Sequence, residues 1–164
     1  MALRSAAFDA KSKTFAVLSQ DNRLHLWDVE SKKEKKSYVD KNHLSHSYTC
    51  FTWKQGKKDK LGELAVGFSD GVVIIWDLAR GVISKTIGTA NESPAPTDIA
   101  FSLDKSSIFV STNQNNVSQY NISTGEEIAS FKASKKGVSK LASHPKSNVF
   151  AAAGYVMHVN YVLF

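Results

Sequence analysis

Short apolar segments separated by turn residues recur along the chain and follow the period of a β-strand. Between Thr49 and Ile87 the four segments are Thr49–Trp53, Glu63–Phe68, Val72–Asp77 and Val82–Ile87. Their residues alternate between apolar and polar or form brief continuous apolar runs, which is typical of strands buried on one or both faces. This stretch is therefore predicted to form four strands and no helix.

The same pattern repeats along the chain. The units cover residues 3–38, 49–87, 97–131 and, less completely, 138–154. The landmark aromatic residues of the first three units, Trp27, Trp76 and Tyr120, lie 49 and 44 positions apart. Between the second and third segments of these units stand Gln20-Asp21-Asn22, Ser69-Asp70-Gly71 and Asn113-Gln114-Asn115, all of them turn formers. A repeat of this length made of four strands is typical of the blades of a β-propeller.

Two of the landmarks belong to the dipeptides Trp27-Asp28 and Trp76-Asp77, and the third unit has Tyr120-Asn121 as an eroded copy. On these motifs the sequence resembles a WD40 β-propeller. The resemblance implies an all-β fold with about three complete four-stranded blades and a partial fourth in residues 1–154. The positions predicted to hold the blades in shape are Trp27, Asp28, Asp70, Trp76, Asp77 and Tyr120.

In this family a histidine, a hydroxyl residue, the turn aspartate and the tryptophan form a buried hydrogen-bond network. Asp70 and Trp76 match, and either His43 or His46 is available as the histidine. Val66 and Phe68 stand where the hydroxyl residue would be. The network is therefore predicted to be incomplete, with apolar packing as the main support of each blade.

The segments SAAFDAKSKTFAVLSQDNRLHLWD, HLSHSYTCFTW and KQGKKDK also resemble a narrower group. This group is the amino-terminal propeller of small-subunit processome factors of the WD-repeat protein 43 and U-three-protein 5 type. The resemblance implies a non-enzymatic scaffold for protein–protein interaction in ribosome biogenesis, acting in pre-rRNA processing or transcription. It also implies a location in the nucleus and nucleolus, with the other proteins of a multi-subunit nucleolar complex as partners.

A seven-bladed ring at about 40 residues per blade needs roughly 280 residues, so a chain of 164 residues supplies about half a ring. Because Leu3 already begins an innermost strand, we expect the outer strand of that blade to come from the far end of a longer chain. Residues 155–164 are expected to be an apolar tail that does not match the family and lacks the third strand. We hypothesise that the chain is a fragment, the product of a truncated gene model or an alternative product. In one version of this hypothesis the chain has no independent activity.

The net charge of +6 favours nucleic acid or acidic partners, with a solvated basic face as the alternative. Two lysine clusters are predicted to lie in connections on one side of the propeller: Lys32, Lys33, Lys35 and Lys36, and Lys54, Lys57, Lys58 and Lys60. A third set, Lys132, Lys135, Lys136 and Lys140, is expected on the opposite side. The two-loop patch is a candidate for RNA contact through counterion release with little sequence preference. Interleaved aromatic residues for base stacking are missing from it.

The sequence contains no motif typical of a catalytic or cofactor-binding site. The five histidines lack metal-ligand spacing, and no phosphate-binding glycine motif is present. Cys50 is predicted to be a buried small apolar residue and not a reactive thiol. We therefore predict a non-enzyme without metal, cofactor or small-molecule substrate. No apolar run approaches the roughly 20 residues that span a bilayer, so no membrane is expected as a partner.

The segment Trp76-Asp77-Leu78-Ala79-Arg80 leaves one alternative function open. It resembles the box by which some WD40 proteins dock to the adaptor of a cullin–RING ubiquitin ligase. In that hypothesis the chain is a substrate receptor, and Arg80 makes charge-assisted bonds with the adaptor.

Overall fold

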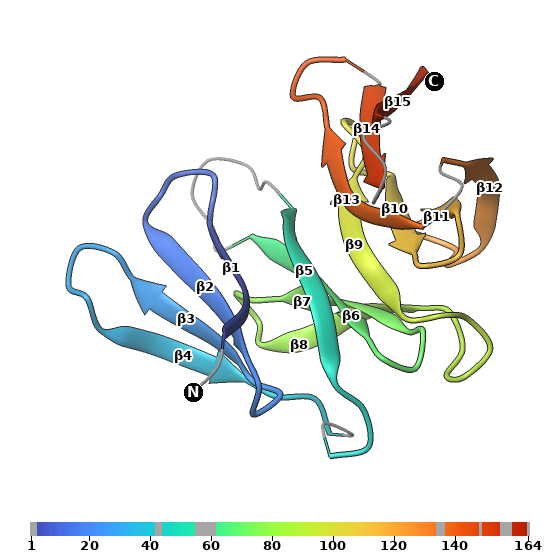
Figure 1. Ribbon diagram of the computed structural model, residues 1–164. Coiled ribbons are helices and arrows are strands. Elements are labelled where there is room, and N and C mark those ends of the chain that lie inside the picture. The colour runs from blue at the N-terminus through green and yellow to red at the C-terminus, as the bar shows by residue number, and fades with distance from the viewer. Residues whose placement is uncertain are drawn as a thin grey trace.

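A computed structural model describes residues 3–41, 44–54, 62–133, 137–147, 149–154 and 159–163. These residues form strands and turns in four antiparallel sheets that follow one another along the chain (Figure 1). The first two sheets contain β1 (Leu3–Phe8), β2 (Thr14–Ser19), β3 (Leu24–Asp28) and β4 (Glu34–Tyr38), and β5 (Tyr48–Lys54), β6 (Glu63–Phe68), β7 (Val73–Asp77) and β8 (Val82–Ile87). The third contains β9 (Pro96–Phe101), β10 (Ser107–Thr112), β11 (Asn116–Asn121) and β12 (Glu127–Lys132). The fourth contains β13 (Val138–Ser143), β14 (Val149–Gly154) and β15 (Val159–Leu163).

Each sheet is a meander in which every strand pairs with its neighbour in sequence. The first strands of successive sheets lie side by side, because β5 contacts both β1 and β9, and β9 contacts β13. Figure 1 shows the sheets arranged like blades around this inner row. The molecule is therefore an all-β, incomplete propeller, as the repeat predicted. The four strands expected between Thr49 and Ile87 are all present, with bounds that move by at most one residue.

Apolar side chains from facing sheets form a separate core at each interface between sheets. Leu18, Leu26, Val66 and Trp76 are among those buried between the first and second sheets. Equivalent clusters lie between the second and third sheets and between the third and fourth. Burying a side chain of this size stabilises the fold by about 1.5–3 kcal/mol. The period-2 pattern of the sequence arises because the two faces of a blade serve two different interfaces.

The inner strand of every sheet contains a bulge near its beginning, where one residue has no partner on the second strand. The extra residues are Arg4, Thr49, Thr97 and Ser139. Such a bulge bends the strand and increases its local twist. The repeat is therefore preserved in backbone geometry even in the third and fourth sheets, where the sequence motif has faded.

Two expectations about the ends of the repeat array are wrong. The first sheet needs no strand from elsewhere, because β4 pairs with β3 and completes it. The tail was expected to lack a third strand, yet β15 pairs with β14 from Leu163 to Val159. The residues Val-Asn-Tyr-Val-Leu have the alternation and the β-branched content of a strand. The fourth sheet thus has three strands.

Candidate interaction surface

The residue that ends the third strand of each complete sheet closes the turn into the fourth strand. Its side-chain oxygen accepts a hydrogen bond from the backbone amide three residues further on. The bonds run to Asp28 from Ser31 at 2.7 Å, to Asp77 from Arg80 at 3.0 Å and to Asn121 from Thr124 at 3.2 Å. Aspartate and asparagine both accept such bonds. The eroded copy in the third sheet therefore keeps the structural role of the motif.

The next position in these turns has a left-handed backbone. Gly81 and Gly125 occupy it with φ of 73° and 84°, and the first sheet has Lys32 there with φ of 55°. Only glycine adopts this conformation without a steric cost. The turn between β3 and β4 therefore holds a lysine where the other sheets have glycine.

The two tryptophans of the motif have different surroundings. Trp76 is 6% exposed, and its ring lies 5.4 Å from that of Tyr38 in the first sheet. Trp27 is 38% exposed and pairs across the strands with Phe15, whose ring lies 4.7 Å from that of Phe8. Phe8 is itself 55% exposed. The face of the first sheet directed away from the second sheet is therefore an exposed aromatic row.

His46 and Asp70 form the part of the predicted hydrogen-bond network that is present in the structure. Nδ1 of His46 lies 3.0 Å from the Asp70 carboxylate, and Nε2 lies 3.4 Å from that of Asp40. The imidazole meets the Phe68 ring edge-on at 4.3 Å. The sequence did not decide whether His43 or His46 is the histidine of this network. His46 makes the contact, and His43 lies outside the described residues. The contact joins the connection between two sheets to the β6–β7 turn.

The first lysine cluster divides into two pairs. Lys32 and Lys33 are exposed in the β3–β4 connection, where no ion-pair partner for them is found among the described residues. Lys35 and Lys36 lie on β4 itself. The Lys35 ammonium is 2.7 Å from the Asp28 carboxylate and holds the pKa of Asp28 well below its usual range, together with the Ser31 bonds. The Lys36 ammonium lies 4.8 Å from the centre of the Tyr38 ring.

Lys54 of the second cluster is held in place. Its ammonium is 2.6 Å from the Glu63 carboxylate and 5.7 Å from the centre of the Phe101 ring, and its side chain is 19% exposed. Lys57, Lys58 and Lys60 lie outside the described residues. In the third set Lys132 ends β12, Lys140 is 3.7 Å from Asp98, and Lys135 and Lys136 lie outside the described residues.

The β1–β2, β3–β4 and β7–β8 connections lie at one end of the sheets. This follows from the antiparallel order and from Trp53, whose indole donates to the Ala7 carbonyl at 3.2 Å and so places the end of β5 beside the end of β1. Exposed cations at this end, called the basic end below, are Lys11, Lys13, Lys32, Lys33 and Arg80. Sequence reasoning missed Lys11 and Lys13, since they form no run. The Arg80 side chain is 80% exposed, with Nε 3.6 Å from Asp77.

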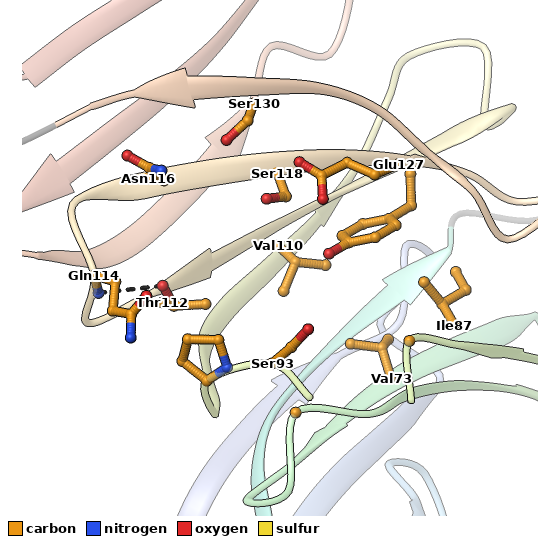
Figure 2. Close-up of a pocket in the computed structure, with 14 residues that line it drawn as sticks. Val73, Ile87, Ser93, Val110, Thr112, Gln114, Asn116, Ser118, Glu127 and Ser130 are labelled. Atoms are coloured by element: carbon orange, nitrogen blue, oxygen red, sulfur yellow. Dashed lines mark hydrogen bonds between the residues drawn. The ribbon is translucent and has the colours of Figure 1, made fainter. Parts of the chain in front are cut away.

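The hollows between the sheets include two that are lined by residues from separate repeats. One of about 240 Å³, called the inter-sheet groove below, separates the outer strands of the second and third sheets (Figure 2). Its walls include Val73, Ile87, Val110, Ser118, Tyr120 and Glu127. The other, of about 420 Å³, lies among β5, β9 and β13 and the connections that follow β9 and β13. The sequence did not indicate either, because each depends on residues from separate repeats.

The described residues place no group of three or more histidine, cysteine, aspartate or glutamate side chains where they could hold a metal ion. Cys50 is buried as predicted, and burial raises the pKa of its thiol to about 12. The described part of the chain also contains no helix long and apolar enough to cross a membrane.

Comparison with known proteins gives one informative similarity. The chain is 21% identical over 168 residues to human WD repeat-containing protein 43, a match that covers 90% of this chain and 25% of that protein. The chain thus spans about a quarter of the length of the curated relative it matches. No protein-family model matches the sequence. The similarity agrees with the blades, the two Trp-Asp dipeptides and the turns that they close.

Proposed function

We propose that this chain is a run of WD40 propeller blades that acts as a non-enzymatic protein-interaction scaffold in ribosome biogenesis. It acts in the nucleus and nucleolus, as part of a multi-subunit complex that assembles on pre-ribosomal RNA. The similarity to WD repeat-containing protein 43 and the processome-type segments in the sequence support the proposal.

The basic end is the observation on which the mechanism rests. Lys32 and Lys33 are exposed and have no described ion-pair partner, and Lys11, Lys13 and Arg80 lie at the same end. Phosphates or carboxylates that approach this end replace its counterions, so the attraction is long-ranged, salt-sensitive and independent of base sequence. Lys57, Lys58 and Lys60 follow Lys54 in sequence and lie outside the described residues, so the mechanism does not rest on them. Lys35 and Lys54 contribute less, because each already neutralises a carboxylate.

The test is affinity purification of the tagged chain from nuclear extract, with and without RNase, followed by protein identification and a probe for pre-ribosomal RNA. We expect processome proteins in both samples and pre-ribosomal RNA in the untreated sample. Replacing Lys32 and Lys33 together by glutamate is expected to lower RNA recovery and to leave the fold intact. Arg23→Glu combined with Lys41→Glu is the matched control, because it changes the net charge by the same amount and both residues are exposed in connections at the opposite end. Recovery of chaperones alone would contradict the proposal.

A second candidate function rests on Arg80. Its side chain is largely exposed at the basic end, available for charge-assisted bonds with a ubiquitin-ligase adaptor. In that case Arg80→Ala abolishes recovery of the adaptor without changing the melting temperature. Arg23→Ala, an exposed arginine in the β2–β3 connection, provides the control. If adaptor recovery survives Arg80→Ala, or no adaptor is found with the wild type, this candidate is eliminated.

A further inference from the structure

The two interfaces on either side of the second sheet differ in a regular way. Strand pairing sets Leu64 opposite Trp76 and, in the third sheet, Ile108 opposite Tyr120, so the two sheets align position by position. The second sheet directs Phe68, Val72, Ile74 and Trp76 at the first sheet, and all four are buried. At the matching positions the third sheet has Thr112, Asn116, Ser118 and Tyr120. Three positions that are apolar in the second sheet are thus polar in the third, and the fourth has tyrosine in place of tryptophan.

This exchange accounts for the inter-sheet groove. Thr112 and Ser118 are smaller than the phenylalanine and isoleucine that they match, so they leave unfilled space, and Asn116 puts a polar side chain where the second sheet has valine. The resulting hollow of about 240 Å³ has one apolar wall, with Val73 and Ile87 from the second sheet, and one polar wall from β11 and β12 (Figure 2). Its volume is below the roughly 300–1,000 Å³ of small-molecule sites. The size suits one side chain of a bound polypeptide better than a cofactor.

The polar wall has a net negative charge. Among the described residues that line the groove, Glu127 is the one with a charged side chain. It pairs across the strands with Tyr120, which also lines the groove, and Figure 2 shows the Glu127 carboxylate beside Ser118. Burial raises the pKa of Tyr120, and the charge of Glu127 raises it further. The phenol therefore stays neutral, its hydroxyl interacts with the side chains of Ser118 and Glu127, and its partly buried ring lines the groove.

We propose that the inter-sheet groove binds an arginine side chain of a partner polypeptide. The planar guanidinium donates to the Glu127 carboxylate and stacks on the Tyr120 ring, a pairing that suits arginine better than lysine. The hydroxyl of Ser118 accepts a further N–H bond, and Val73, Ile87 and Val110 pack against the methylene stem. This site goes beyond the scaffold function proposed above, since it lies away from the basic end and selects the opposite charge.

The test is a titration of the isotope-labelled full chain, followed by NMR, with a capped Gly-Arg-Gly tripeptide. The same peptide with citrulline in place of arginine has nearly the same shape without the charge. We expect shifts at groove residues with the arginine peptide, and binding about tenfold weaker with citrulline, because a charge-assisted bond is lost. Glu127→Gln should weaken binding of the arginine peptide by a similar factor. Glu126→Gln is the control, because Glu126 is exposed and adjacent but does not line the groove.

Ser118→Ile gives the chain the residue that the second sheet has at this position and fills the groove. We expect this variant to melt no lower than the wild type and to lose the peptide. Several outcomes would overturn the proposal: no shifts at millimolar peptide, equal binding of citrulline, equal binding of a lysine peptide, or undiminished binding by Glu127→Gln. Because the assay uses the isolated chain, its result is independent of whether nuclear extract yields processome proteins.

Discussion

The two motif tryptophans differ in burial, and this difference predicts that their replacement lowers the stability of the fold by different amounts. Trp76→Ala removes a ring that is buried between the first and second sheets, beside Tyr38 at 5.4 Å. A buried tryptophan replaced by alanine costs about 3–5 kcal/mol, which includes the cavity left behind. Native domains are stable by only about 5–15 kcal/mol. This one substitution is therefore expected to remove a large part of the free energy of unfolding.

Trp27→Ala makes the same chemical change at the same position of the motif. Its ring is 38% exposed on the open face of the first sheet, so less apolar area leaves the water on folding and no enclosed cavity remains. We expect a cost of about 1–2 kcal/mol, from partial burial alone. The difference between the two variants isolates burial at the interface, because residue type and strand position are matched.

The measurement is urea unfolding of both variants and the wild type, followed by far-UV circular dichroism. Circular dichroism is preferred to fluorescence because each variant removes an emitting indole. If Trp76→Ala is unfolded without urea, Trp76→Phe retains a ring and gives a smaller loss that can be measured. Equal losses at the two tryptophans, with unchanged urea dependence, would refute the assignment of Trp76 to the core and Trp27 to an open face.

Three further outcomes follow from the turns and the buried thiol. Asp28→Ala should lower the melting temperature more than Asp28→Asn, because asparagine keeps the turn bond, as it does in the third sheet. The depressed pKa of Asp28 stabilises the fold above pH 4 and this contribution is lost as pH falls, so Asp28→Asn should reduce the acid sensitivity seen in melting curves at decreasing pH. Gly71→Ala should cost at least about 1–2 kcal/mol in urea unfolding, since its φ is +93° and a Cβ would overlap the Ser93 carbonyl. Gly88→Ala should cost less, since its φ is +80° but a Cβ there would make only an ordinary van der Waals contact with the Gly71 carbonyl oxygen at 3.4 Å. Cys50, with its pKa near 12, should react with a thiol reagent at pH 8 only as fast as the chain opens, and rapid labelling of the folded chain would show that it is exposed.

Features set within one repeat could be predicted from the sequence. The strands of the second unit, the buried Cys50 and the repeated four-stranded sheets all follow from local alternation and turn residues. The prediction failed where a local rule was applied too strictly. The first sheet was expected to take its outer strand from elsewhere, and the tail was expected to lack a strand because it has no family motif, yet β4 and Val159–Leu163 both pair as strands.

Features set between repeats could not be predicted. Lys35 and Lys54 look like free charges in sequence, yet each meets a carboxylate on a neighbouring strand. The inter-sheet groove depends on how large the residues of β11 are relative to those of β7, a comparison that is possible only after the register of both sheets is known. The spacing of motifs in the sequence predicts each sheet, whereas the sizes of the side chains that meet between two sheets determine whether a groove is left between them.

The two proposed surfaces require partners of opposite charge, and this constrains how the scaffold works. The basic end gathers Lys32 and Lys33 with other cations in the connections at one end of the sheets, whereas the groove offers Glu127 between two blades. An acidic segment or an RNA phosphate is repelled by the groove, and an arginine side chain is repelled by the basic end. Each partner is therefore directed to its own site. The second sheet carries Arg80 at the basic end and the apolar wall of the groove, so under the proposed function this one sheet links the two sites at a fixed distance.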